Sequence, residues 1–360
     1  MMKKGTREYV LITGGAGFVG SNLADALLRE GERVIVADNF SRAGVRLNAA
    51  WLKATHGDRV RIENVDVADA ARMRALVRES RQVFHLAAQV AVTTSLIDPA
   101  LDLRTNIIGT FNVLEAARTM LNPPPILFTS TNKVYGGMEE VPVELGEGGY
   151  RYGGGLAGVT EEQPLDFHSP YGCSKGAADQ YVHDYARIFG LPTVVFRMSC
   201  VYGTRQFGTE DQGWVAHFAR AIRAGEGLTI YGDGQQVRDI LWIDDLVRAM
   251  RLAMDRIDTV AGEVFNIGGG ARNAVSVRTV IDRLHEISGS EVPVTMADWR
   301  PGDQRVYVSD TGKLERVLGW RPETSWKAGL EKLVAWLDEA KLDSALAEVE
   351  DEGALVKAGG

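Results

Sequence analysis

Short runs of apolar and β-branched residues recur along the first two hundred positions, with helix-like stretches between them. Six runs predict strands, at residues 9–13, 34–38, 60–65, 83–87, 126–129 and 193–196. Apolar strands that alternate with helices indicate a parallel sheet covered on both faces. The pattern therefore predicts an α/β fold of the Rossmann type, a doubly wound parallel sheet.

The pattern becomes irregular after about residue 200. Turn-rich stretches at 231–234 and 268–270 precede two predicted helices, at 275–288 and 327–340. In the second helix, Leu330, Leu333, Val334 and Leu337 form a stripe with the spacing of one helix face, which predicts a core-facing surface. A smaller α/β lobe beside the sheet fits this region better than a second nucleotide fold.

Composition narrows the class of protein further. The 360 residues are 45% hydrophobic and 24% charged, as in an ordinary soluble globular protein, and the net charge of -8 gives no basic field for nucleic acid. No apolar run approaches the roughly 20 residues that span a bilayer, and residues 1–7 do not resemble a signal peptide, so we expect a cytoplasmic protein. The two cysteines and six histidines lack metal-ligand spacing, and we expect no metal.

A glycine-rich turn forms the first candidate site. Gly14, Gly17 and Gly20 follow the first predicted strand and open a helix, where glycines let the backbone approach a pyrophosphate and point the helix N-terminus at its charge. Asp38 closes the next strand, where a carboxylate accepts hydrogen bonds from a ribose diol and repels a 2′-phosphate. We therefore expect NAD rather than NADP, although Arg42 is near enough in the chain to weaken that preference.

A tyrosine and a lysine form the second candidate site. Tyr171 and Lys175 lie four residues apart at the predicted start of a helix and so share one face. The ammonium can stabilise a phenolate and bring the phenol pKa closer to neutrality. Such pairs also occur by chance on exposed helices, but Thr129, Ser130 and Thr131 end a predicted strand at the sheet edge where these folds bind ligands.

These motifs resemble the extended short-chain dehydrogenase/reductase family that acts on nucleotide sugars, over roughly residues 8–340. The resemblance implies a triad in which Thr131 hydrogen-bonds the reacting oxygen, Tyr171 is the base and Lys175 also holds the nicotinamide ribose. It further implies a set of residues around NAD: Gly14, Gly17, Phe18, Val19, Gly20, Asp38, Asn39, Ser41, Arg42, Asp66, Val67, Leu86, Ala87, Ala88, Gln89, Asn106, Thr129, Tyr171, Lys175 and Met198.

The two residues that directly follow Thr131 bear on the type of reaction. Family members that remove water from the sugar carry Asp-Glu in this register, as the acid and the base of the elimination. Asn132 and Lys133 stand there instead, and a neutral amide cannot supply the acid. This favours oxidation, rotation of the keto-sugar and hydride return, which together epimerise one carbon. The motifs at 130–136, 184–190, 202–207 and 211–214 look most like those of the nucleotide-sugar 2-epimerases.

The expected partner is a nucleotide-diphosphate sugar, whose diphosphate suits arginine side chains. The candidate substrate residues are Gln89, Thr131, Asn132, Ser199, Cys200, Arg205, Gln206, Gln212, Trp214, Arg238 and Arg300. Met198 and Cys200 depart from the 2-epimerase pattern, which has histidine and serine there. The sugar and the nucleotide (CDP, GDP or UDP) therefore stay open. So does a 4-epimerase that uses the same triad, and a non-catalytic NAD-binding scaffold is a further alternative.

These expectations divide the chain. We expect an NAD-binding domain over residues 1–190, to which a segment around 236–266 could return, a mainly substrate-binding lobe over 191–340 and a tail, which could be disordered, over 341–360. Residues 136–158 contain nine glycines and predict a long mobile loop, either a surface insertion or a lid over the sugar. The resemblance also implies a homodimer or homotetramer paired through helices near 104–120 and 174–189.

Overall fold

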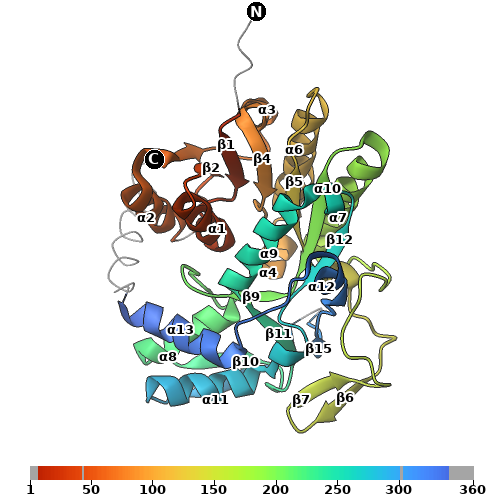
Figure 1. Cartoon of the computed structure of the whole chain (residues 1–360). Helices are drawn as coiled ribbons and strands as arrows, with labels where there is room; N and C mark the ends of the chain where they lie inside the picture. Colours follow the sequence, from red (N-terminus) through yellow and green to blue (C-terminus); the bar gives the residue numbers. More distant parts are fainter. Residues whose placement is uncertain (1–6, 43, 301–302, 340–360) are drawn as a thin grey trace, which may run out of the picture.

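A seven-stranded parallel sheet forms the centre of the computed structural model, which describes residues 7–42, 44–300 and 303–339 (Figure 1). The strand order is β12-β8-β5-β4-β1-β2-β3. The strands are β1 (Tyr9–Thr13), β2 (Arg33–Asp38), β3 (Val60–Asn64), β4 (Ser80–His85), β5 (Ile126–Thr131), β8 (Thr193–Met198) and β12 (Val264–Ile267). The predicted doubly wound fold is confirmed, and each of the six predicted strands is present within a few residues.

Helices cover both faces of this sheet because alternate residues of each strand point to opposite sides. Val10 and Ile12 pack on the side of α1 (Phe18–Arg29), α2 (Val45–His56) and α9 (Ile243–Asp255). Leu11 packs on the other side, toward α3 (Ala70–Glu79), α6 (Gly109–Arg118) and α7 (Ser169–Phe189). Shorter elements, α4 (Val92–Ile97), α5 (Pro99–Asp102) and a π-helix (Leu103–Ile108), lead into α6.

A second lobe lies below the sheet in the view of Figure 1. Helices α8 (Trp214–Ala224), α11 (Val277–Ser288) and α13 (Trp326–Glu339) pack together there. Two small sheets join them, one of β10 (Leu228–Tyr231) and β14 (Val294–Ala297), the other of β9 (Cys200–Tyr202), β11 (Val237–Trp242), β13 (Ala274–Ser276) and β15 (Val306–Tyr307). In α13, Leu330, Leu333 and Leu337 are buried, which confirms the predicted core-facing stripe. Helices α10 (Ile257–Val260) and α12 (Gly312–Leu318) complete this half of the chain.

The chain crosses between the two lobes more than once. Strand β8 lies beyond residue 190 and β12 lies near residue 266, yet both belong to the large sheet. Strand β11 belongs instead to the second lobe, where it pairs with β9. The expected tail at 341–360 lies outside the described residues. No helix in the described ranges is long and apolar enough to cross a membrane.

The glycine-rich segment 136–158 differs from its prediction. Strands β6 (Val143–Gly146) and β7 (Gly149–Tyr152) form an antiparallel hairpin, and β7 packs on β11, β13 and β15. Gly149 has φ +117°, and a Cβ there would lie 2.6 Å from the Gln235 carbonyl oxygen. The Tyr150 hydroxyl donates to Asp233 at 2.7 Å. The expectation of a long loop is therefore wrong for 143–152, which forms a hairpin. Gly149 is needed there for close backbone packing and does not indicate a mobile loop.

Candidate active site

The turn between β1 and α1 is built for close backbone approach. Gly14 has φ +66°, and a Cβ there would lie 2.8 Å from the Ala87 amide nitrogen. A Cβ on Gly20 would clash with the Gly14 carbonyl oxygen and lie 2.6 Å from the Gly15 Cα. Helix α1 starts at Phe18, and no side chain caps its N-terminus, which leaves the first-turn amides of Phe18 and Val19 for an anion.

Asp38, at the end of β2, lies against the same turn. Its carboxylate accepts hydrogen bonds from the amides of Ala16 at 3.1 Å and Phe40 at 2.9 Å. Burial raises the Asp38 pKa, while these hydrogen bonds and the charge of Arg42 lower it. Asn39 accepts from the Ser41 amide at 3.1 Å and holds the following turn. The carboxylate thus lies where the ribose of a dinucleotide on this turn would need an acceptor.

The neighbouring strand ends complete the cleft. Leu86 donates from its amide to the Thr13 carbonyl at 3.1 Å, which places Leu86, Ala87 and Ala88 beside the glycine turn. Asp66 accepts the Ala68 amide at 2.8 Å, and Val67 is buried. Glycine turn, uncapped helix and strand-end carboxylate together fit NAD, with Thr129 and Met198 at the ends of the next two strands of the sheet.

Helix α7 and strand β5 bring the three candidate catalytic residues together. Tyr171 and Lys175 lie one turn apart on the buried face of α7, and Thr131 ends β5. Thr131 hydrogen-bonds the Tyr171 hydroxyl, which lowers the phenol pKa. The Lys175 ammonium donates to the Thr129 carbonyl at 2.5 Å and lies 4.2 Å from the Phe128 ring centroid.

Burial changes the expected electrostatics of this pair. It raises the Tyr171 pKa, and the Asp102 carboxylate raises it further. Burial lowers the Lys175 pKa to about 7. The expectation that Lys175 brings the Tyr171 pKa toward neutrality is therefore wrong for the protein alone, because the ammonium is turned to a carbonyl and desolvation dominates.

A buried polar network lies beside Tyr171. Asn106 donates to Ser174 at 2.9 Å and accepts the Gln89 amide at 2.9 Å. The Gln89 side chain donates to Asp102 at 2.7 Å, and Ser174 donates to the same carboxylate at 3.2 Å. The structure therefore places Gln89 in this network rather than on the cavity wall, and Asn106 joins the Gln89 backbone to Ser174.

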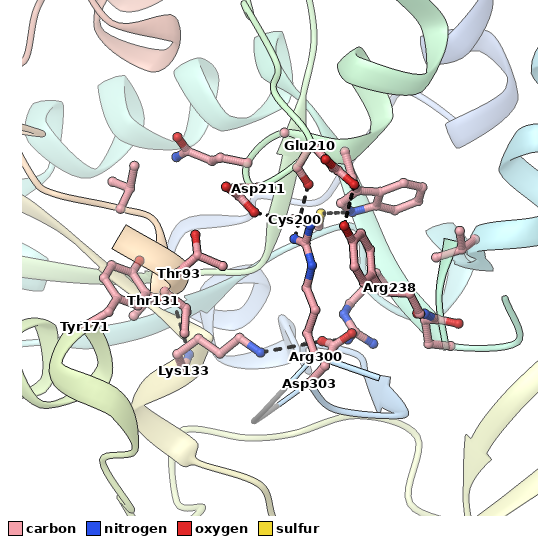
Figure 2. A pocket seen from close by; sticks show the side chains of 18 of the residues that line it. Thr93, Thr131, Lys133, Tyr171, Cys200, Glu210, Asp211, Arg238, Arg300 and Asp303 are labelled. Carbon is pink, nitrogen blue, oxygen red and sulfur yellow. Dashed lines mark hydrogen bonds and ion pairs between the residues drawn. The ribbon is translucent and has the colours of Figure 1, made fainter. Parts of the chain in front are cut away.

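A cavity of about 380 Å³ opens between the two lobes, with Tyr171 and Thr131 at one end (Figure 2). Among the predicted substrate residues, Thr131, Asn132, Ser199, Cys200, Gln212, Trp214, Arg238 and Arg300 line it. Besides Gln89, two predicted substrate residues do not line it. Arg205 stacks on the Trp51 ring, and Gln206 donates to the Val201 carbonyl at 3.2 Å. Both side chains therefore contact other segments of the protein instead of the cavity.

The predicted substrate residues did not include several charged or polar residues that line the cavity: Thr93, Lys133, Glu210, Asp211, Tyr231, Gln236 and Asp303. Among them, Lys133, Glu210 and Asp211 lie within two positions of a predicted residue in the sequence. That closeness is a signal from which they could have been predicted. Thr93 and Tyr231 carry no such signal. Cys200 accepts from the Trp214 indole at 2.9 Å, and burial raises its pKa to about 11, so the thiol is protonated and inert at neutral pH.

The cations of the cavity are matched with carboxylates. Arg238 bonds Asp303 at 2.6 Å and the Gln304 carbonyl at 2.6 Å. Arg300 pairs with Asp211 at 3.2 Å and lies 3.9 Å above the Tyr231 ring. Within the described residues, no cluster of His, Cys, Asp or Glu could hold a metal ion.

Comparisons with known proteins agree with this geometry. The family described as GDP-mannose 4,6 dehydratase matches residues 11–333. CDP-paratose 2-epimerase from Salmonella typhi is 43% identical over 338 residues, which are 91% of this chain and 98% of that protein. The chain therefore belongs to this family, and the predicted resemblance to nucleotide-sugar epimerases and dehydratases is confirmed.

Two solved structures show the same fold with different activities. UDP-glucose 4-epimerase from Thermotoga maritima, with UDP-glucose, has a TM-score of 0.80 and 33% identity, covering 92% of this chain and 99% of that one. A double mutant of dTDP-glucose 4,6-dehydratase from Streptomyces venezuelae, with NAD bound, has a TM-score of 0.79 and 31% identity, covering 92% and 97%. The fold thus supports an enzyme of this class without deciding between epimerase and dehydratase.

Proposed function

We propose that this protein is an NAD-dependent nucleotide-sugar 2-epimerase that acts by transient oxidation to a 2-keto sugar, as a CDP-paratose 2-epimerase would. The observation that carries the proposal is the pair that follows Thr131. Asn132 and Lys133 line the cavity beside Tyr171, so an amide and a cation stand where an elimination would need an acid and a base. The 43% identity to the Salmonella typhi protein supports the choice of C2.

NAD is the proposed cofactor. Its pyrophosphate would lie on the α1 N-terminus, and the Asp38 carboxylate would accept the ribose hydroxyls. When bound, NAD supplies a hydride acceptor and, once reduced, the matching donor.

The remaining chemistry belongs to the side chains of the chain itself. Tyr171 takes the proton from the sugar hydroxyl as the carbon is oxidised and returns it when the carbon is reduced. Thr131 hydrogen-bonds both the Tyr171 hydroxyl and the reacting oxygen, which aligns the proton transfer. Lys175 adds a positive charge that favours the phenolate once a ligand draws it away from Thr129.

Asn132 orients the sugar and does not protonate it. Its amide donates to Gln304 at 3.3 Å, and its carbonyl accepts from Thr131 at 3.4 Å. Arg238 and Arg300 face the same cavity and suit the diphosphate. The keto-sugar has to turn over between the two proton transfers, within the cavity of about 380 Å³.

A nucleotide-sugar 4-epimerase is the second candidate. It would use the same three residues with C4 of the sugar toward Tyr171, and the similarity to the Thermotoga maritima 4-epimerase favours it. A non-catalytic NAD-binding scaffold has less support, because Thr131, Tyr171 and Lys175 are all present and assembled.

A homo-oligomer is also proposed. Phe111 on α6 and Tyr181 on α7 are 40% and 46% exposed, and their rings meet edge to face at 6.4 Å. Ile188, farther along α7, is 66% exposed. An apolar surface on these two helices suits a two-fold helix pair. Sedimentation of a monomer at micromolar concentration would contradict the proposal.

Proton NMR of product mixtures tests the reaction. Purified protein without added cofactor is incubated with CDP-, GDP- and UDP-hexoses, and the C2 and C4 configurations are followed. Inversion at C2 supports the proposal and names the nucleotide. Inversion at C4 supports the second candidate, and a 4-keto-6-deoxy product would show a dehydratase.

A further inference from the structure

Lys133 lies between the reacting residues and the arginines of the cavity. Its amide donates to Thr131 Oγ1 at 3.2 Å, so the residue starts beside the triad. Its side chain then runs along the cavity toward Asp303, and the ammonium lies 3.9 Å from that carboxylate (Figure 2). With 26% of its side chain exposed, Lys133 faces the cavity from a largely buried position.

Lys133 and Arg238 lie beside the same carboxylate in the cavity. Asp303 bonds Arg238 at 2.6 Å and lies farther from Lys133, so one carboxylate serves two cations. Burial, together with the charge of Arg238, lowers the Lys133 pKa to about 8. The other carboxylates of the cavity, Glu210 and Asp211, are used at the far end by Tyr231 and Arg300. A phosphate placed beside Lys133 would meet two cationic side chains, Lys133 and Arg238.

We propose that Lys133 binds the phosphate attached to the sugar and thereby selects C2 as the carbon that faces Tyr171. The phosphate is carried by the oxygen on C1, next to C2 and across the ring from C4. With the 2-hydroxyl on Tyr171 and Thr131, the phosphate lies close to the triad, where Lys133 begins. With the 4-hydroxyl there, it lies farther along the cavity, toward Arg300. This inference rests on the proposed 2-epimerase function.

The test uses CDP and CMP as probes, because the terminal phosphate of CDP is the one attached to the sugar in the substrate. Relative to the wild-type holoprotein, we expect Lys133→Met to weaken CDP binding roughly ten- to hundredfold, because a charged hydrogen bond is lost. CMP binding should weaken by less than about threefold. Lys133→Arg should restore most of the CDP affinity. Lys53→Met removes a surface lysine and serves as the matched control, and bound NAD and thermal unfolding report folding.

The same variants test the selection of carbon. We expect Lys133→Met to lose C2 inversion mainly through a raised KM and to gain inversion at C4 relative to C2. Equal weakening of CDP and CMP, or an unchanged KM, would overturn the inference even if the wild type inverts C2. Wild-type inversion at C4 alone would instead overturn the proposed function, while the comparison of CDP with CMP would still report on the phosphate contact.

The pH dependence gives an independent readout. Arg238, Asp303 and Cys200 are among the groups that interact electrostatically with the Lys133 ammonium. Since the ammonium is present below its pKa of about 8, CDP affinity should fall as pH rises from about 7 to 9 in the wild type. Lys133→Arg should abolish this fall, and persistence of the same fall in that variant would contradict the role of Lys133.

Discussion

The two ends of the cavity are built in different ways. At the reacting end, Tyr171, Lys175 and Thr131 come from one helix and one central strand, and each is buried and hydrogen-bonded. At the other end, Arg300, Asp211 and Tyr231 come from separate segments of the second lobe, and their charges balance one another. The first end is held by the core of the sheet, whereas the second is held by side-chain pairs that a ligand can replace.

This difference assigns different tasks to the two ends. A rigid end keeps the proton donor and acceptor in place for the chemistry of any sugar hydroxyl. An end made of exchangeable ion pairs sets which nucleotide sugar binds and how far it enters. Substitutions at the first end should therefore lower kcat, and those at the second should raise KM.

Removal of the Tyr171 hydroxyl should have the largest effect. Tyr171→Phe removes the base but keeps the ring, so turnover should fall roughly 10²- to 10⁴-fold with NAD still bound. Steady-state kinetics and the absorbance of released cofactor measure the two quantities. Substantial turnover by this variant would assign the base elsewhere.

Substitution in the glycine turn should come next. Gly20→Ala places a Cβ against the Gly14 carbonyl oxygen, and the strain should cost about 1–3 kcal/mol and displace NAD. Gly148→Ala is the matched control, because a Cβ there meets nothing within 4 Å. Thermal unfolding and cofactor content compare the two variants, and equal behaviour would refute the role given to this turn.

A smaller effect is expected from Arg300. Arg300→Gln removes the guanidinium above Tyr231 and should raise KM roughly tenfold with kcat nearly unchanged, because the diphosphate contact is the same in ground and transition states. Arg72→Gln on the surface of α3 should change neither constant. A fall in kcat alone would break the division between the two ends.

Cofactor selectivity should change by a similar factor. Asp38→Asn removes the carboxylate charge but keeps an oxygen for the Ala16 and Phe40 amides, so the preference for NAD over NADP should fall about tenfold. The affinities of NAD and NADP for protein from which the bound cofactor has been removed measure this preference. Unchanged selectivity would point to Arg42 as the residue that sets it.

The sequence predicted the reacting end better than the substrate end. The places of Gly14, Gly20 and Asp38 follow from backbone geometry and strand order, which the hydrophobic periodicity predicts. Tyr171 and Lys175 lie on one helix, so their spacing alone predicts that they share a face. By contrast, Arg205 was expected in the cavity but stacks on Trp51, while Tyr231 lies in it unpredicted. Which side chain of a loop reaches a cavity depends on tertiary packing that local spacing does not record.

The hairpin at 143–152 and the Tyr171 pKa also depend on tertiary packing that the sequence pattern did not reveal. Glycine content alone did not reveal that β7 packs closely on β11 and β15. Helical spacing placed Lys175 beside Tyr171 but not its bond to the Thr129 carbonyl. Burial then decided the sign of the pKa shift, and burial follows from the whole fold.

Hydride return to the same carbon is the central claim, and an isotope experiment tests it most directly. A CDP-hexose labelled with deuterium at C2 is incubated with the holoprotein in ordinary water, and the inverted product is examined by NMR and mass spectrometry. The account predicts that the product keeps deuterium at C2, because the hydride leaves and returns without exchange with solvent. Replacement of the label by solvent hydrogen at C2 would contradict it and indicate proton abstraction from carbon.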